Sequence, residues 1–416
     1  MERFQQAMKR PQQAVVLCGG LGTRLHPYTD HMPKPMMLCN GKPFLWHLLQ
    51  QLYEQKINRF VLLTGYLAEK IESYFGDGSS WGWEIHYSEG PVEWDTGKRI
   101  WEAREEIDDQ FLLLYSDNFS LFPLDKVIAF HERNQKPLTF MVAPKIPGNI
   151  NLNENCIVQE YNNNRSDKSL DYVEIGYMIV EKEQTLAFYE EPECSFSSIL
   201  KMMATQHQIS AWIQRDAYHS ISDPERWKKT EDYLYPKKII LIDRDGVINN
   251  KAPKGEYISK WKDFEFVSDT ISGLKFLAKQ GFQFIVISNQ AGVARGMIDL
   301  VELEQIHNSM IDKLTEFGIK ILDIYVCPHH WNDNCSCRKP NPGLFYQATS
   351  DWSFRLDKTL FIGDDSRDCQ AAYNAGCESV FIGNESELLD LSDQEKPIYV
   401  STKLSDCATK ISQYFN

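Results

Sequence analysis

Short apolar runs alternate along the first half of the chain with segments whose apolar residues have helical spacing. An apolar run closed by a turn residue is typical of a strand in a parallel sheet, because both faces of such a strand are covered. The pattern predicts strands at residues 13–18, 60–64, 111–115 and 138–142, and helices at residues 43–55, 67–75 and 124–134. This alternation indicates a wound α/β sheet.

The alternation begins again in the second half of the chain. Apolar runs predict further strands at residues 238–242, 284–288, 321–326 and 359–362. The polar stretch at residues 230–237 is the expected linker. We therefore predict an α/β protein of two wound, mainly parallel-sheet domains in tandem, residues 1–234 and 235–416, each with a Rossmann-like fold.

Composition narrows the class of protein further. The 416 residues are 43% hydrophobic and 25% charged, which is ordinary for globular domains. The formal net charge of −14 disfavours nucleic acid as a partner. The first residues lack the apolar core of a signal peptide, and no run approaches the roughly 18 apolar residues that span a bilayer. We expect a cytoplasmic protein with no membrane partner.

Carboxylate and hydroxyl side chains follow three of the predicted strands in the second half. Asp243 and Asp245 come directly after the first of these strands, Ser288 ends the next, and Asp364 follows the last. Open α/β sheets bind ligands where the carboxyl ends of their strands meet. Three such clusters at three strand ends therefore indicate a site rather than solvated turns.

Phosphoryl transfer through an aspartyl phosphate is the chemistry that these groups suit. Asp243 would attack phosphorus, and Asp245 would protonate the leaving group and then activate water. Asp364 would share Mg²⁺ with Asp243 and the backbone carbonyl of Asp245, since Mg²⁺ prefers oxygen ligands. Ser288 and Lys339 would hold the transferring phosphoryl group.

Three cysteines and two histidines fall within residues 327–340. Cysteine clusters in a chain without an export signal indicate a metal site rather than disulfides. Cys327, Cys335 and Cys337 with one histidine form a Cys₃His set that suits tetrahedral Zn²⁺. His329 and His330 are rival candidates for the fourth ligand.

The motifs of the second half occur in the order DRDGVIN, SNQAGVARG, CPHH with CSCRKPNPG, and GDDSRDCQAAYNAG. In this order they resemble the motifs of the haloacid-dehalogenase superfamily phosphatases, specifically the branch with heptose bisphosphate 7-phosphatases and histidinol-phosphate phosphatases. The likeness covers about residues 238–385. It implies the same roles for the residues named above, and substrate contacts from Asn289, Arg295 and Arg338.

The resemblance also bears on the metal cluster. It implies a structural Zn²⁺ and selects His329 as the fourth ligand. A loop held by a bound metal ion would fix the direction in which the charged side chains of Arg338 and Lys339 point, since these residues follow Cys337 directly. The five residues between His329 and Cys335 resemble the histidinol-phosphate branch, so the substrate is less firmly implied than the reaction.

The first half carries a glycine-rich loop, GGLGTRLHPYT, after its first strand, and then MPKPMM. Such a loop offers backbone donors to a phosphate chain. Both motifs resemble the signature of sugar-1-phosphate nucleotidyltransferases, which join a sugar phosphate to a nucleoside triphosphate and release pyrophosphate. The likeness covers about residues 12–234 and includes TGKRI at residues 96–100. It implies nucleotide contacts from Gly19, Gly20, Gly22, Thr23, Arg24 and Lys34, and Asp117 as a Mg²⁺ ligand.

One position departs from that family's pattern. A second metal-binding aspartate is usual in a segment W/Y-x-D-I-G-x-P-E, and the matching segment YHSISDPE places Ser220 there. Two carboxylates on the metal normally steer the attacking phosphate, so the loss of one would slow or abolish transfer. Glu174 and Asp223 are candidates to replace the missing carboxylate.

Both implied activities fit one route. A heptose 1,7-bisphosphate would lose its 7-phosphate, and the heptose 1-phosphate would then be joined to a nucleotide. GTP is the expected nucleotide, because the guanylyl branch of this pathway uses a transferase with a GGxGTRL loop. The alternative is a phosphatase of another sugar phosphate or of histidinol phosphate, whose first half is a degenerate, noncatalytic nucleotide-binding module. The expected partners are a small sugar phosphate and a nucleoside triphosphate, and the motifs predict no oligomeric state.

Overall fold

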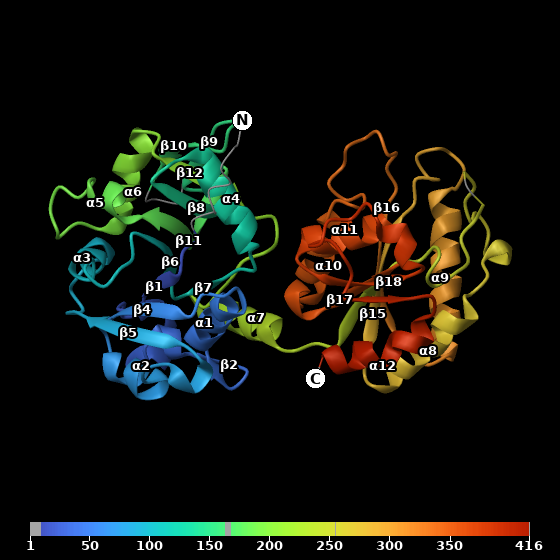
Figure 1. Ribbon diagram of the computed structural model, residues 1–416, viewed down its shortest axis with the longest axis horizontal. Coiled ribbons are helices and arrows are strands. Elements are labelled where there is room, and N and C mark those ends of the chain that lie inside the picture. Colours follow the sequence, from blue (N-terminus) through green and yellow to red (C-terminus); the bar gives the residue numbers. More distant parts are fainter. Residues whose placement is uncertain (1–9, 163–167, 254, 416) are drawn as a thin grey trace. The chain divides into compact units, whose positions relative to one another are not determined.

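A computed structural model describes residues 10–162, 168–253 and 255–415 of the protein. The chain divides into two compact units, of which the first ends at Asp232 and the second begins at Tyr233 (Figure 1). The boundary predicted between residues 234 and 235 lies at the last residue of helix α7 (Pro224–Leu234). Within the described residues, every helix is too short or too polar to cross a membrane.

The first unit contains one large sheet with a parallel centre. Its strand order is β10-β9-β11-β6-β1-β4-β5, with β8 paired to β11 and β12. The predicted strands are present as β1 (Gln13–Leu17), β4 (Arg59–Thr64), β6 (Gln110–Tyr115) and β8 (Leu138–Pro144). The predicted helices are present as α1 (Phe44–Glu54), α2 (Ala68–Phe75) and α4 (Leu124–Asn134).

Further elements of the first unit were not evident from the apolar pattern. The strands among them are β5 (Glu84–Glu89), β9 (Ile150–Leu152), β10 (Val158–Tyr161), β11 (Tyr172–Glu181) and β12 (Ile209–Ile213). The helices are α3 (Thr96–Glu102), α5 (Lys182–Leu186) and α6 (Phe196–Thr205). Two small ladders join β2 (Leu38–Cys39) to β3 (Lys42–Pro43) and β7 (Asn118–Phe119) to β13 (His219–Ser220). Because β11 runs antiparallel between β6 and β8, the sheet is mixed on this side.

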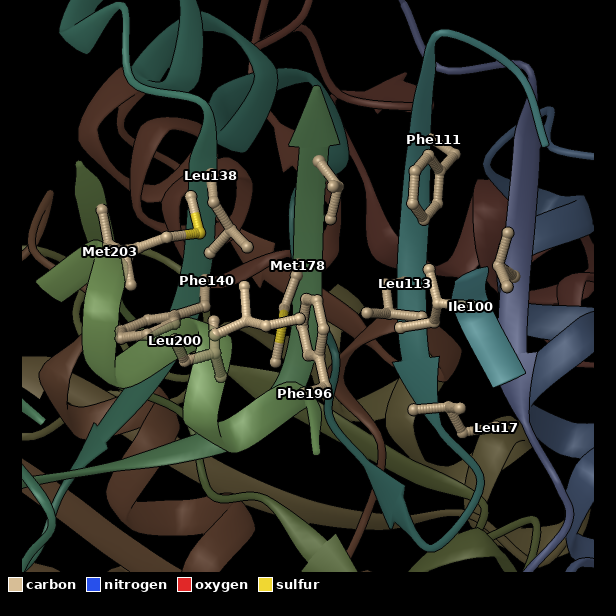
Figure 2. Packing of buried hydrophobic residues seen from close by; sticks show 14 of the residues in the cluster. Leu17, Ile100, Phe111, Leu113, Leu138, Phe140, Met178, Phe196, Leu200 and Met203 are labelled. Atoms are coloured by element: carbon tan, nitrogen blue, oxygen red, sulfur yellow. The ribbon is translucent and has the colours of Figure 1, made fainter. Parts of the chain in front are cut away.

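The core of the first unit lies between this sheet and helix α6. Phe140 of β8, Met178 of β11 and Leu113 of β6 point to the same face, since Met178 is directly opposite each of the other two in the sheet. Phe196 and Leu200 of α6 pack over them (Figure 2). Each of these five residues is at most 2% exposed. This packing fixes the strands from whose ends the loops of the site begin.

The second unit contains a sheet in which every strand pairing is parallel. Its strand order is β16-β15-β14-β17-β18-β19. The predicted strands are β14 (Ile239–Ile242), β15 (Gln283–Asn289), β16 (Ile321–Cys327) and β17 (Leu360–Gly363). Two more strands, β18 (Glu378–Ile382) and β19 (Tyr399–Ser401), extend the sheet. The helices are α8 (Ser268–Lys279), α9 (Leu300–Glu316), α10 (Gly343–Trp352), α11 (Ser366–Ala375) and α12 (Leu404–Tyr414).

Helices cover both faces of the parallel sheet. Helices α8, α9 and α12 share a core with one face, to which Ile242 and Ile362 belong. The neighbouring residue Phe361 points to the opposite face, where its ring centroid lies 4.9 Å from that of Phe345 on α10. Burial on both faces explains why these strands are continuous apolar runs in the sequence.

The topology of each unit brings two loops together at the carboxyl ends of the strands. In the second unit β14 lies between β15 and β17, and in the first unit β1 lies between β4 and β6. The strands on the two sides of each central strand are thus reached by connections that run in opposite directions along the sheet. At such a point a crevice opens between the loops that follow the central strand and its neighbour. The candidate residues of both units lie in such loops.

Candidate active sites and metal-ligand cluster

A buried ion-pair group lies at the carboxyl end of β14. The ammonium Nζ of Lys339 lies 3.0 Å from Asp243 Oδ1 and 2.8 Å from Asp368 Oδ1, and it donates to the Ile287 carbonyl at 3.0 Å. Lys339 is 3% exposed, Asp243 8% and Asp368 2%. The structure thus joins the predicted Asp243 and Lys339 directly, and it adds Asp368.

Asp243, Asp364 and Asp368 form an acidic cluster in which one carboxylate oxygen from each residue lies within 4.8 Å of the other two. Burial raises the pKa of Asp243 to about 7, with the nearby carboxylates adding to the rise and Lys339 opposing it. Burial also raises the pKa of Asp364 to about 6, against the lowering effect of Lys251, whose ammonium lies 2.6 Å away. Within the described residues, Asp364 Oδ1 is buried and has no hydrogen-bond partner. An orphaned carboxylate oxygen in a crowded acidic group fits a divalent cation with oxygen ligands.

The side chain of Asp245 is held by a separate network. Arg244, which is 0% exposed, donates from Nη2 to both carboxylate oxygens at 2.9 Å. Asn249 donates to the same carboxylate at 3.0 Å and Gln290 at 2.6 Å. Burial alone would raise the pKa of Asp245, but these donors together lower it. Gln290 also donates to Ser288 Oγ at 2.9 Å, so the predicted Ser288 lies beside Asp245.

The other predicted substrate residues divide into two groups. Asn289 donates to the Lys339 carbonyl at 3.2 Å and accepts from the Lys339 amide at 3.1 Å, which fixes the backbone of Lys339. Arg338 is half-buried. Arg295 is exposed and stacks between Tyr257 and Trp331, with its guanidinium carbon 5.6 Å and 5.4 Å from their ring centroids. The structure therefore joins Asn289 to the ion-pair group and places Arg295 in a separate stack.

The predicted Cys₃His set forms one compact group. Sγ of Cys335 lies 3.6 Å from Sγ of Cys327 and 3.4 Å from Sγ of Cys337. His329 Nδ1 lies 3.7 Å from the Cys327 sulfur and 3.1 Å from the Cys337 sulfur. Ligands at the corners of a tetrahedral zinc site are separated by about 3.5–3.8 Å, given Zn–S and Zn–N bonds of about 2.3 and 2.0 Å. The four side chains therefore fit a tetrahedral metal ion of this size.

The rival histidine, His330, lies outside that group. Its ring packs on Trp331 with the ring centroids 3.9 Å apart, and its Nδ1 accepts from the Asn332 amide at 3.2 Å. The structure thus places His329, and not His330, with the cysteines.

In the first unit, a cavity of about 510 Å³ opens at the carboxyl ends of β1 and β6. Asp117 lines this cavity. So do all six residues predicted to contact the nucleotide, which are Gly19, Gly20, Gly22, Thr23, Arg24 and Lys34. Lys34 Nζ lies 2.6 Å from Asp117 Oδ2. The cavity lining thus combines the backbone of the glycine loop with three cationic side chains, Arg24, Lys34 and Arg99, and three carboxylates, Glu93, Asp95 and Asp117.

Arg99 is a part of this cavity that the sequence analysis did not single out. It is 5% exposed and donates to the carbonyls of Thr64 at 2.5 Å and Pro91 at 2.7 Å. A side chain at Gly19 would collide with its guanidinium group. Burial lowers the pKa of Arg99. The only sequence signal was its place in the TGKRI segment, because the contacts come from loops distant in sequence.

Ser220, which the sequence analysis aligns with an expected second metal-binding aspartate, lies beside Asp117. β13 pairs with β7 so that Ser220 is opposite Asn118, and the Ile221 amide donates to the Asp117 carbonyl at 3.0 Å. A second cavity of about 310 Å³ is lined by Arg24, Asp117, Asn118, Glu174, Tyr218, Ser220, Ser222 and Arg226. Of the two candidate replacements, Glu174 lines this cavity, whereas Asp223 binds the Arg226 amide and the Ser222 hydroxyl.

Comparisons with known proteins match each unit separately. The family described as "Nucleotidyl transferase" matches residues 13–149, and the family described as "Polynucleotide kinase 3 phosphatase" matches residues 238–393. The D-glycero-alpha-D-manno-heptose-1,7-bisphosphate 7-phosphatase of Photorhabdus laumondii is 36% identical over 152 residues, which are 35% of this chain and 81% of that protein. The D-glycero-beta-D-manno-heptose-1,7-bisphosphate 7-phosphatase of Helicobacter pylori strain 26695 is 37% identical over 33% of this chain and 79% of that protein. The crystal structure of HddC from Yersinia pseudotuberculosis superposes with a TM-score of 0.46 and 21% identity, covering 54% of this chain and all of that chain.

Gly246 is expected to be essential for the acidic cluster. It has a φ of +94°, and a side chain there would collide with the Asp364 carboxylate. Gly246→Ala should lower phosphate release from a phosphate monoester by roughly a hundredfold, because it displaces a group of the site. Gly281→Ala is the matched control, since Gly281 has a φ of +89° and its nearest neighbour would be 4.0 Å away. Both variants should lose similar thermal stability, and equal activity in the two would contradict the expectation.

The Cys₃His group should hold one metal ion that depends on His329. His329→Ala is expected to remove most of the bound metal and lower the melting temperature, because three ligands leave a structural site open. His330→Ala should keep the metal, and it controls for the loss of an imidazole from the same loop. Inductively coupled plasma mass spectrometry of the purified variants measures the metal content, and equal loss in both would contradict the assignment.

Proposed function

The chain belongs, through its second unit, to the family of D-glycero-D-manno-heptose-1,7-bisphosphate 7-phosphatases, and from this membership we propose a bifunctional enzyme of nucleotide-activated heptose synthesis. It removes the 7-phosphate of the bisphosphate and joins the remaining heptose 1-phosphate to a nucleotide. The observation that carries the proposal is the buried group of Asp243, Lys339 and Asp368 beside Asp364 at the strand ends.

Asp243 is the nucleophile of the phosphatase reaction in this proposal. Its carboxylate oxygen forms a bond to phosphorus while the bond from phosphorus to the sugar oxygen breaks, which leaves an aspartyl phosphate. Lys339 supports this role because its ammonium lies 3.0 Å from the nucleophile and offsets the charge of the phosphoryl oxygens. Ser288, linked to the site by Gln290, is placed to donate to the same oxygens.

Asp245 transfers the proton in both steps of the proposed reaction. It gives a proton to the departing sugar oxygen and then takes one from the water that attacks the aspartyl phosphate. Its lowered pKa suits the second role in the free protein. A phosphate dianion that approaches Asp245 raises that pKa by charge repulsion, which suits the first role.

Two metal ions in the second unit belong to the proposal. Mg²⁺ held by Asp243, Asp364 and the backbone carbonyl of Asp245, beside Asp368 of the same acidic cluster, would supply positive charge against the phosphate. Zn²⁺ held by Cys327, His329, Cys335 and Cys337 would brace the loop that leads to Lys339.

The first unit is the proposed nucleotidyltransferase, with the heptose 1-phosphate and a nucleoside triphosphate as substrates. The glycine loop, Arg24 and Lys34 line one cavity, which suits a triphosphate chain. Asp117 is the carboxylate that would share Mg²⁺ with the nucleotide phosphates. GTP remains the expected nucleotide.

Two variants should separate the two activities. Asp243→Asn is expected to lower phosphate release from D-glycero-D-manno-heptose 1,7-bisphosphate by at least about a thousandfold, because the nucleophile is lost. Asp365→Asn is the matched control, since Asp365 caps α11 and pairs with Arg367 outside the acidic cluster. Full phosphate release by Asp243→Asn would contradict the covalent mechanism.

Lys34→Gln should show the opposite pattern. Given heptose 1-phosphate, Mg²⁺ and each nucleoside triphosphate in turn, the native protein should release pyrophosphate with GTP. Lys34→Gln should lose most of this release and keep phosphate release, while Asp243→Asn keeps pyrophosphate release. Nucleotide binding without pyrophosphate from the native protein would instead support the noncatalytic binding module.

A further inference from the structure

We propose that Arg226 binds the phosphate of the sugar 1-phosphate in the first unit, in the place where related transferases use a second metal-binding carboxylate. This inference rests on the proposed nucleotidyltransferase function. The observation behind it is that the side chain next to Ser220 is cationic rather than acidic. Arg226 Nη1 lies 3.5 Å from Ser220 Oγ, and both residues line the cavity of about 310 Å³.

This cavity adjoins the nucleotide cavity, because Arg24, Asp117 and Ser222 line both. A sugar phosphate that occupies it would meet a triphosphate in the neighbouring cavity near Asp117. Transfer needs this arrangement, since an oxygen of the sugar phosphate must attack the α-phosphorus while pyrophosphate departs.

Ser220 does not supply a second metal-binding carboxylate, and Glu174, the other carboxylate on the wall of this cavity, is buried and accepts from the Tyr161 hydroxyl at 3.2 Å. Asp117 is paired with Lys34 at 2.6 Å, and Ser220 offers a neutral hydroxyl. One carboxylate with the nucleotide's own phosphates is enough for Mg²⁺, but it leaves the second phosphate group without a cation. Arg226 and Arg24 provide two guanidinium groups on the wall of this cavity.

Arg226 is available to bind an anion. Its side chain is 46% exposed, and its nearest carboxylate oxygen, on Asp223, lies 3.5 Å away. This separation is long for a charge-assisted hydrogen bond, so a bound phosphate can compete for the guanidinium group. The planar guanidinium group donates two parallel hydrogen bonds to a phosphate, which a single ammonium group does not.

The backbone that carries Arg226 is anchored to the site. Asp223 accepts from the Arg226 amide at 3.0 Å, and Thr230 of α7 donates to the Ser220 carbonyl at 2.8 Å. Trp227 donates from its ring nitrogen to the Leu38 carbonyl at 2.9 Å. These contacts fix the first turns of α7 beside Ser220, so the side chain of Arg226 starts from a defined position.

The test measures binding of heptose 1-phosphate to the full chain by isothermal titration calorimetry, with EDTA and then with Mg²⁺. Arg226→Gln should weaken this binding about ten- to a hundredfold in both buffers, and Arg226→Lys should recover part of it. Binding of GTP should change less than about twofold. Lys228→Gln is the matched control, because Lys228 is an exposed cation on the same helix that lines neither cavity.

Ser220→Asp gives a second, independent measurement. A carboxylate beside Arg226 should weaken heptose 1-phosphate binding in EDTA by a similar factor, and added Mg²⁺ should restore part of it. Native-like binding by Arg226→Gln, or sugar phosphate binding by the native chain that EDTA abolishes, would overturn the inference. If the native chain binds heptose 1-phosphate through Arg226 but releases no pyrophosphate with any nucleotide, the site assignment stands and the transferase proposal fails.

Discussion

The ammonium group of Lys339 lies between the carboxylates of Asp243 and Asp368, and only 3% of the residue is exposed. Removing one partner of a buried ion pair typically costs about 3–5 kcal/mol, because the remaining charge is left without compensation. Lys339 therefore ties three separate parts of the second unit together: the end of β14, the start of α11 and the loop after the cysteines. Asp368 takes part twice, since its other oxygen accepts from the amides of Asp364 and Asp365 at 3.1 Å.

The surrounding elements make that ion pair possible. Asn289 holds the backbone of Lys339 by two hydrogen bonds from the end of β15. The Cys₃His group closes the loop just before it, with Cys337 only two residues away. A long cationic side chain loses rotational freedom when it is buried, and a loop fixed at both ends reduces that cost. The metal-ligand cluster thus contributes to the site through the position of one lysine.

Both units place their polar groups where neighbouring strands of the sheet end, but the balance of charge differs. In the second unit Lys339 pairs with two carboxylates of a three-carboxylate cluster, an arrangement that suits a nucleophile and a divalent cation. In the first unit four cationic side chains, Arg24, Lys34, Arg99 and Arg226, line the two cavities together with Asp117 and three other carboxylates, and these cations suit two phosphate-bearing substrates. The two proposed reactions are compatible, because removal of the 7-phosphate leaves in place the anomeric phosphate that the transfer step requires.

The sequence alone determined the two α/β units, the strands that carry the motifs and the three cysteines of the Cys₃His set, because each depends on residues close together in the chain. The choice of His329 over His330 was implied by the family resemblance, and the structure groups His329 with the cysteines. The buried strands β1, β6, β14 and β15 were evident since apolar runs of this length have few alternatives. Strand β11 was not evident, because Glu174 and Gly176 interrupt its apolar run and its antiparallel neighbours are distant in sequence. Only the tertiary structure revealed the contacts of Asp368, Arg99 and Arg226. Their significance comes from buried charge and from contacts between loops, and neither leaves a local pattern in the sequence.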